Sequence, residues 1–368
     1  MLDPHDKYMR RALILARRGL GKTGPNPAVG CVIVKNGKVV GEGWHKRAGT
    51  PHAEVHALAQ AGTSAKNADV YVTLEPCAHF GKTPPCADAL IEAGVARVYA
   101  GMVDPNPRVS GRGLEKLRAA GIGATAGILG EDCRVVNEPF IKHVTTGLPF
   151  VILKSALTLD GKSATAEGDA RWISSEKSRR YVHKLRSQVD AIMVGVGTVI
   201  ADDPQLTARI PGGKDPLRVV VDSNLKVPLS AKLLHVKSKA KTLVATVSND
   251  APRISGIMET GAEIVVCQDK MGKVDLPDLL ARLGAMFIQS VLLEGGSTLA
   301  GEALRQGLID KVMLFYAPKL VGGEGPGLFA GRGVARMEDA IHLRNIAFTR
   351  FGEDILIQGY PETACLQG

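Results

Sequence analysis

The residues whose types and spacing point most directly to chemistry are His52, Cys77 and Cys86, the two cysteines each preceded by a proline. One imidazole and two thiolates form a ligand set that suits zinc, and a catalytic zinc keeps one of its four positions for water. Zinc lowers the pKa of that water to roughly 7, which makes it a nucleophile at neutral pH. We therefore expect these three residues to bind one catalytic Zn²⁺ per chain.

Glu54 lies two residues after His52, so that its carboxylate can face the expected zinc site without binding the metal. From there it could take a proton from the attacking water and pass it to a ring nitrogen and a departing amine, as the acid–base glutamate of zinc deaminases does. The pattern predicts hydrolytic deamination with Glu54 as the catalytic residue. The alternative is a zinc-stabilised interaction module without activity, which would need a fourth protein ligand such as His79.

The elements that must position these residues are typical of an α/β domain. His52 and Cys86 each lie at the start of a predicted helix, and Cys77 follows a predicted strand. Helix N-termini favour thiolate over thiol, which helps to charge the ligands. Asn36-Gly37 predicts an antiparallel hairpin at one edge of the sheet. The expected helices span residues 4–18, 51–61, 84–94 and 113–121, and the expected strands span 28–34, 38–44, 70–74 and 95–100.

A second α/β domain is predicted after a boundary at Gly147, which divides the chain into residues 1–147 and 148–368. We expect this domain to have three layers, with a mainly parallel sheet and an antiparallel edge. The expected strands span residues 150–156, 191–194, 217–221, 242–247, 263–266, 290–293, 311–317, 343–351 and 354–359, and the expected helices 175–187, 275–284 and 297–306.

The second half has glycine-rich turns but lacks the usual dinucleotide-binding fingerprint. The turn from Gly195 to Thr198 begins like Gly-x-Gly-x-x-Gly, but the third glycine is missing. After another predicted strand, Gly295 and Gly296 free the backbone and Ser297 opens a helix, so that N–H groups there could bind a pyrophosphate. From the residues alone, a tight packing turn is an equal alternative.

The composition indicates which kinds of ligand and partner the protein can have. The chain has 368 residues, a formal charge of +9 and 45% hydrophobic residues. Its basic residues are scattered rather than interleaved with aromatics, which favours a basic enzyme with phosphorylated ligands over a nucleic-acid-binding protein. It has no apolar run of membrane-spanning length and no secretory signal pattern, so we expect a cytoplasmic protein that does not bind membranes. The six cysteines are therefore not expected to form a disulfide framework.

The zinc constellation resembles the cytidine deaminase-like superfamily, with one departure. Its usual Pro-Cys-x-x-Cys motif is replaced by eight residues between Cys77 and Cys86. This insertion is similar to that of the bifunctional riboflavin-biosynthesis deaminase-reductases. The sequences around Asn26 (Pro-Asn-Pro-Ala-Val-Gly), His45 (Gly-Trp-His) and Asp104 (Asp-Pro-Asn-Pro) match the same family, and the resemblance covers essentially the whole chain.

The resemblance implies a cytidine deaminase-like domain followed by a dihydrofolate reductase-like domain. The first would remove the C2 amine of a diaminohydroxypyrimidine that carries a ribosylamino 5-phosphate. The second would reduce the ribosyl group to ribityl with NADPH. By match to the family motifs, Asn26, His45 and Lys82 would hold the small phosphorylated pyrimidine in the first domain. We also expect the enzyme to be a homo-oligomer.

For the second domain, the resemblance implies a cofactor site and a substrate site that adjoin. Ala170 stands where the family usually has a serine, two residues before Trp172. His183 and His235 are expected to be surface or packing residues. The expected cofactor contacts are Ala156, Trp172, Thr198, Asp202, Gly295, Gly296 and Ser297, and the expected substrate contacts are Lys154, Ala170, Arg186, Leu206, Arg209 and Glu294.

A tRNA adenosine deaminase with an appended domain is the competing enzymatic interpretation, because it shares the His-x-Glu and Pro-Cys elements. The eight residues between Cys77 and Cys86, and the large second α/β domain, argue against it.

Overall fold

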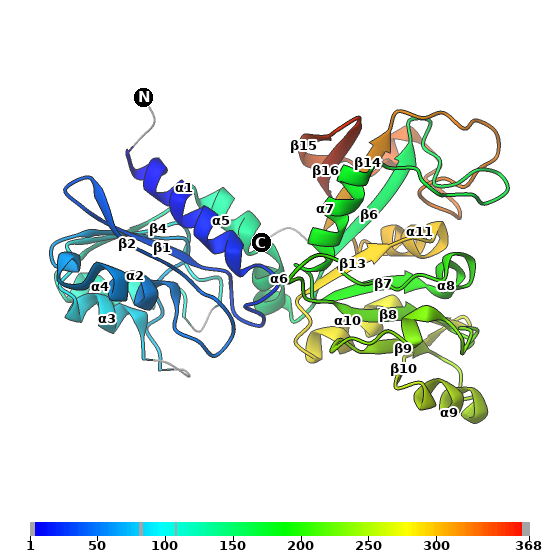
Figure 1. Cartoon of the computed structure of the whole chain (residues 1–368), viewed down its shortest axis with the longest axis horizontal. Coiled ribbons are helices and arrows are strands. Elements are labelled where there is room, and N and C mark those ends of the chain that lie inside the picture. The colour runs from blue at the N-terminus through cyan, green and yellow to red at the C-terminus, as the bar shows by residue number, and fades with distance from the viewer. Residues whose placement is uncertain (1–3, 81–83, 107–108, 363–368) are drawn as a thin grey trace. The chain divides into compact units, whose positions relative to one another are not determined.

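The computed structural model describes residues 4–80, 84–106 and 109–362. It divides into two compact units, Met1–Gly147 and Leu148–Gly368, each with its own sheet and core (Figure 1). No helix among the described residues is long and apolar enough to cross a membrane. Both units are mixed α/β, which confirms the predicted fold class.

The first unit is built on a five-stranded sheet in the order β2-β1-β3-β4-β5. The first three strands in this order are antiparallel, and β3, β4 and β5 are parallel, so the predicted edge hairpin is confirmed. The strands are β1 (Gly30–Lys35), β2 (Lys38–Trp44), β3 (Asp69–Val72), β4 (Arg97–Ala100) and β5 (Gly123–Ala126).

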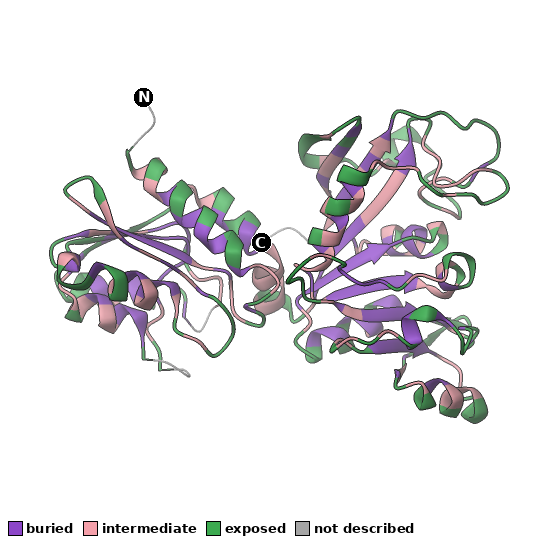
Figure 2. Cartoon of the chain, viewed as in Figure 1, coloured by how far each residue is buried: buried purple, intermediate pink, exposed green. Residues whose placement is uncertain are grey.

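Helices cover both faces of this sheet. One apolar cluster lies between the sheet and α2, α3 and α4, and a second lies between the sheet and α1 and α5. Figure 2 shows the middle strands of the sheet as largely buried and the outer helix faces as exposed. The helices are α1 (Pro4–Ala16), α2 (Ala53–Ala61), α3 (Cys86–Glu92), α4 (Arg112–Ala119), α5 (Gly130–Val136) and α6 (Glu138–Thr146).

Close contact between α2 and β2 fixes the position of the His-Ala-Glu motif. A Cβ atom on Gly43 would lie 2.1 Å from the carbonyl oxygen of Ala53, so only glycine lets the first turn of α2 rest on the strand backbone. His52 is the N-cap residue of α2, with extended backbone angles. The start of α2 is therefore held rigidly at the end of β2.

The second unit has a nine-stranded sheet in the order β10-β9-β8-β7-β13-β6-β14-β16-β15. Seven strands are parallel, and β16 and β15 form the antiparallel edge that the sequence predicts. The strands are β6 (Phe150–Thr158), β7 (Ala191–Gly195), β8 (Leu217–Val221), β9 (Thr242–Thr246), β10 (Glu263–Val266), β13 (Ser290–Glu294), β14 (Lys311–Ala317), β15 (Leu343–Phe351) and β16 (Asp354–Pro361).

Helices again lie on both faces, which gives three layers. The helices α10 and α11 pack against one apolar cluster, while α7 and the pair α8 and α9 pack against two others. The helices are α7 (Glu176–Arg186), α8 (Val196–Asp202), α9 (Ala251–Glu259), α10 (Leu276–Ala285) and α11 (Ser297–Arg305).

The prediction of a glycine-rich turn from Gly195 to Thr198 is wrong, because a helix begins there. The segment after Gly195 is the helix α8, and Gly195 is its N-cap residue. The helix forms because the chain must turn back from a parallel strand, and Val199 is then fully buried in the core.

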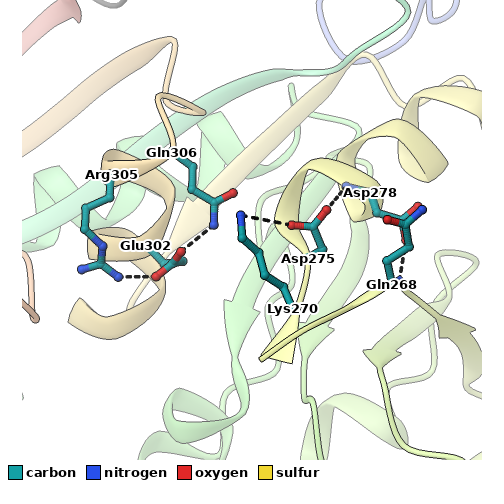
Figure 3. A network of polar contacts seen from close by, with 7 residues as sticks. All are labelled: Gln268, Lys270, Asp275, Asp278, Glu302, Arg305 and Gln306. Atoms are coloured by element: carbon teal, nitrogen blue, oxygen red, sulfur yellow. Dashed lines mark hydrogen bonds and ion pairs between the residues drawn. The ribbon is translucent and has the colours of Figure 1, made fainter. Parts of the chain in front are cut away.

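A short hairpin, β11 (Asp269–Lys270) with β12 (Lys273–Val274), connects β10 to α10. Asp275 caps α10 by accepting the N–H of Asp278, and it also pairs with Lys270 at 3.7 Å (Figure 3). Such a cap typically contributes about 1 kcal/mol to stability. On α11, Glu302 bonds Arg305 and Gln306 in the same view. These contacts fix the ends of the two helices that cover this face of the sheet.

Candidate active sites

Three side chains of the first unit form a group that could hold a metal ion. One ligand atom from each of His52, Cys77 and Cys86 lies within 4.8 Å of the others. Nδ1 of His52 is 3.2 Å from Sγ of Cys86 and 3.6 Å from Sγ of Cys77. The amide N–H of Cys86, at the first residue of α3, donates to Sγ of Cys77 at 3.3 Å. One imidazole and two soft sulfur donors at these distances fit zinc.

The electrostatics of this group favour a thiolate. The pKa of Cys77 is lowered, first by the hydrogen bond from the Cys86 side chain and then by that from His52. The pKa of the His52 imidazole is raised by the same bond to Cys77. The group therefore already stabilises negative charge on sulfur, which a metal ligand needs.

Glu54 lies beside the three residues and is almost completely buried, with 3% of its surface exposed. Burial first, and the neighbouring Cys77 second, raise the pKa of its carboxyl to about 7. A carboxyl group with a pKa near 7 can both accept and release a proton at neutral pH. The pair of Glu54 and the His/Cys/Cys group therefore has the parts that a hydrolytic site needs.

His45 and Asn26 form the next layer of this site. The His45 and His52 rings meet edge to face with their centroids 5.3 Å apart. Burial lowers the pKa of His45, and its Nδ1 lies 3.2 Å from the Pro51 carbonyl oxygen. A neutral ring that donates from Nδ1 can accept the amide of Asn26 at Nε2, 3.2 Å away. The third expected substrate residue, Lys82, lies outside the described residues.

In the second unit, the main polar cluster surrounds a buried ion pair. Arg186 of α7 donates to both carboxylate oxygens of Glu294, at 2.9 and 2.7 Å. Burial would raise the pKa of Glu294, but Arg186 and then Lys154 outweigh it and lower the pKa to about 2. Lys154 lies opposite Glu294 on the adjacent strand β6. Arg209 lies near enough to interact electrostatically with both members of the pair.

The glycine turn after β13 lies against the first turn of α8. Gly295 and Gly296 have φ angles of 65° and 75°, which a side chain would strain. Cβ atoms there would lie 3.0 and 3.2 Å from atoms of Thr198. Ser297 begins α11, so the turn and the helix direct N–H groups to the carboxyl edge of the sheet. A glycine turn that leads into a helix N-terminus is a kind of site that can bind phosphate groups.

The other expected residues are spread over neighbouring loops. Trp172 is 63% exposed and stacks on the Arg179 guanidinium at 4.4 Å. Arg171 donates to the carbonyl oxygen of Asp202 at 3.1 Å, which ties the Trp172 segment to the end of α8. Ala156, Ala170 and Leu206 have no polar side-chain group, so the contacts expected of them would be apolar or through the backbone.

The sequence analysis missed polar groups in this second cluster. Nδ1 of His183 and Oγ1 of Thr207 are buried without a hydrogen-bond partner among the described residues. Burial, followed by the charges of Arg186 and Arg209, lowers the pKa of His183 to about 4, so its ring is neutral. His183 precedes Arg186 by three residues on one helix, and this spacing could have placed both on one face.

A buried carboxylate close in sequence to Cys77 was missed as well. Glu75 stands directly before the Pro-Cys pair of Cys77, and its buried oxygens accept four backbone N–H groups. A carboxylate at the end of a strand, next to a ligand segment, is the signal that could have drawn attention to it.

Comparison with known proteins covers both units. Residues 2–102 match the family described as the cytidine and deoxycytidylate deaminase zinc-binding region, and residues 149–357 match the RibD C-terminal domain. The riboflavin biosynthesis protein RibD of Actinobacillus pleuropneumoniae is 46% identical over 95% of this chain and 93% of its own length. That of Escherichia coli K12 is 44% identical over 95% and 97%.

Two solved structures are similar over nearly the whole chain. Acinetobacter baumannii RibD superposes with a TM-score of 0.87 at 38% identity, covering 99% of this chain and 100% of that one. A diaminohydroxyphosphoribosylaminopyrimidine deaminase/5-amino-6-(5-phosphoribosylamino)uracil reductase from Thermotoga maritima has a TM-score of 0.85 at 38% identity, covering 97% and 99%.

Fold, site and similarity together define an enzyme in which a zinc-binding deaminase domain is joined to an NADPH-dependent reductase domain. The chain belongs to the RibD family of riboflavin biosynthesis proteins. This match over both halves favours the bifunctional enzyme over a tRNA adenosine deaminase and over an interaction module without activity.

Proposed function

We propose that the first unit hydrolytically deaminates 2,5-diamino-6-(5-phosphoribosylamino)pyrimidin-4-one, and that the second then reduces the ribosyl group of the product to ribityl with NADPH. The observation that carries this proposal is the convergence of His52, Cys77, Cys86 and Glu54 in a chain that aligns end to end with an enzyme named for both reactions.

In the first unit, His52, Cys77 and Cys86 would hold zinc, which when bound supplies the acidity that makes water a nucleophile at neutral pH. Glu54 would take one proton from the attacking water and pass it to the ring nitrogen, and would then move the second proton, from the hydroxyl now on the ring carbon, to the leaving amine. Its pKa near 7 supports both transfers. His45 is held in one tautomer by the carbonyl of Pro51, and it orients the substrate together with Asn26 and Lys82.

In the second unit, the cofactor phosphates would lie on the turn of Gly295, Gly296 and Ser297, beside Thr198. The nicotinamide end would lie towards Ala156, Trp172 and Asp202. The substrate would meet the ion pair of Arg186 and Glu294, with Lys154, Arg209, Leu206 and Ala170 around it. The unpaired Oγ1 of Thr207 supports a polar ligand at this place, since buried polar groups normally have partners.

We place this chemistry in the cytoplasm and expect a homo-oligomer that acts on a free phosphorylated pyrimidine rather than on nucleic acid. The scattered distribution of the positive charge supports the small substrate.

Cys86→Ala tests the proposal most directly. The variant should lose zinc and ammonia release, because two remaining ligands cannot form a stable site. Metal analysis and an ammonia assay on the phosphoribosylaminopyrimidine measure both effects. Cys133→Ala is a matched control, since Cys133 is buried in the same unit but lies in α5. Full zinc occupancy in Cys86→Ala would contradict the assignment of Cys86 as a zinc ligand.

A further inference from the structure

We propose that Glu75 is a positioning residue of the deaminase site. Its buried carboxylate holds the backbone at Asp104 and at the first turn of α4 against the Cys77 segment. These residues form a wall of the site beside Cys77 and His79. This inference rests on the metal site proposed above, because the wall has a role in catalysis only if the reaction takes place there.

The carboxylate of Glu75 accepts four backbone N–H groups. Oε2 accepts those of Asp104 at 3.0 Å and Gly111 at 2.9 Å. Oε1 accepts those of Gly113 at 2.8 Å and Leu114 at 3.3 Å. The backbone N–H of Glu75 donates to the carbonyl oxygen of Met102 at 2.9 Å. The Glu75 side chain therefore binds the chain both shortly after β4, at Asp104, and at the start of α4.

This set of contacts requires two acceptor oxygens on one side chain. Glu75 is 3% exposed, and all four of its partners are donors. The N-terminus of α4 also favours a negative charge there. A glutamine would present one oxygen to two donors and an NH₂ group to the other two, so that half of the contact would be lost.

A second contact holds α4 against the same segment. A Cβ atom on Gly113 would lie 1.9 Å from the carbonyl oxygen of Pro76, so the first turn of α4 rests on the peptide that precedes Cys77. Glu75 and Pro76 are the two residues directly before Cys77, and both are thus fixed by α4.

Asp104, whose backbone N–H binds Glu75, has its side chain near the metal group. The side chain of the half-buried Asp104 accepts the N–H of Asn106 at 2.8 Å. Its carboxylate lies close enough to Cys77 and His79 to interact electrostatically with both. Since the backbone N–H of Asp104 is held by Glu75, the position of this carboxylate beside the metal group depends on Glu75.

Glu75→Gln tests the inference in the full-length, zinc-loaded enzyme. We expect kcat/KM for deamination, per bound zinc, to fall about 10- to 100-fold, because small misplacements of a site wall can cost this much. Zinc content and the reduction of deaminated substrate should stay at the parent's level. Asp190→Asn is the matched control, because Asp190 accepts two backbone N–H groups in the second unit and should leave deamination unchanged.

Gly113→Ala is a second variant that separates α4 from Pro76 without altering the carboxylate, and it decides the matter if Glu75→Gln does not fold. It should lower deamination per zinc to a similar degree. A folded variant with normal deamination per zinc and only a lower melting temperature would overturn the inference. Loss of zinc together with activity would also overturn it, since Glu75 would then support the metal ligands. Failure of the parent to release ammonia would instead contradict the proposed function.

Discussion

Each unit has a buried glutamate at its polar centre, and the pKa values of these two carboxyl groups are shifted in opposite directions. Burial beside Cys77 raises the pKa of Glu54 to about 7, whereas Arg186 and Lys154 overcome burial and lower the pKa of Glu294 to about 2. The first carboxyl is ready to exchange a proton at neutral pH, and the second is fixed as an anion. The same residue type therefore serves proton transfer in one unit and charge pairing in the other.

The two sites also differ in how they are assembled. The metal-binding group and Glu54 of the first site come from one stretch, His52 to Cys86, and a set of one imidazole and two thiols has few other uses. Those of the second come from β6, α7, the loop around Arg209 and β13, and are common residue types. A metal site can therefore be recognised from a motif, while a cofactor site depends on which strands become neighbours.

The largest effect should come from removing the proton carrier. Glu54→Gln should lower deamination about 10²- to 10⁴-fold, because general acid–base transfer is worth that much. Zinc content should remain, since Glu54 is not expected to bind the metal. An ammonia assay measures the loss, and reduction of pre-deaminated substrate by the same variant is the control. Near-normal ammonia release would show that another group carries the proton, and loss of both activities in a folded variant would argue against independent sites.

A smaller effect should follow from a substitution in the glycine turn. Gly296→Asp should weaken NADPH binding about 10- to 100-fold, because backbone strain of about 1–3 kcal/mol adds to the repulsion of phosphate. Titration of NADPH against protein fluorescence measures the affinity, and ammonia release should not change. Gly261→Asp is the control, since Gly261 also has a positive φ, of 88°, but precedes β10 at the other end of the sheet. Equal affinity in the parent and Gly296→Asp would place the cofactor elsewhere.

The third effect concerns stability rather than activity or binding. The depressed pKa of Glu294 stabilises the folded second unit above pH 4.5, and this contribution is lost as the pH falls from about 4.5 to about 2. The full contribution is about 3 kcal/mol. Urea unfolding over this range should show the acid-dependent loss in the parent and not in Glu294→Gln, which should already be less stable at pH 7 because Arg186 is left unpaired.

Glu176→Gln is the control for this experiment, because Glu176 pairs with Arg180 on the surface and should contribute little. An unchanged acid dependence in Glu294→Gln would show that other groups cause the loss.

The sequence by itself determined the fold class and the grouping of the metal-binding residue types. The Asn36-Gly37 pair predicted the hairpin edge, and the apolar segments predicted the parallel strands and most helices, because these patterns are local. His52, Cys77 and Cys86 could be grouped from their residue types and spacing alone, because a set of one imidazole and two thiols has few other uses. Helix α8 was misjudged as a turn, since its seven residues are too few for a clear helical period.

Only the tertiary structure decided which distant groups meet. The insertion of β13 between β7 and β6 brings Glu294 next to Lys154 and within reach of Arg186, and no local pattern encodes that strand order. The four N–H groups that meet on Glu75 come from residues 104–114, and they converge because α4 packs on the Pro76 peptide. The pKa values of Glu54 and Glu294 likewise differ because burial and neighbouring charges are properties of the folded chain.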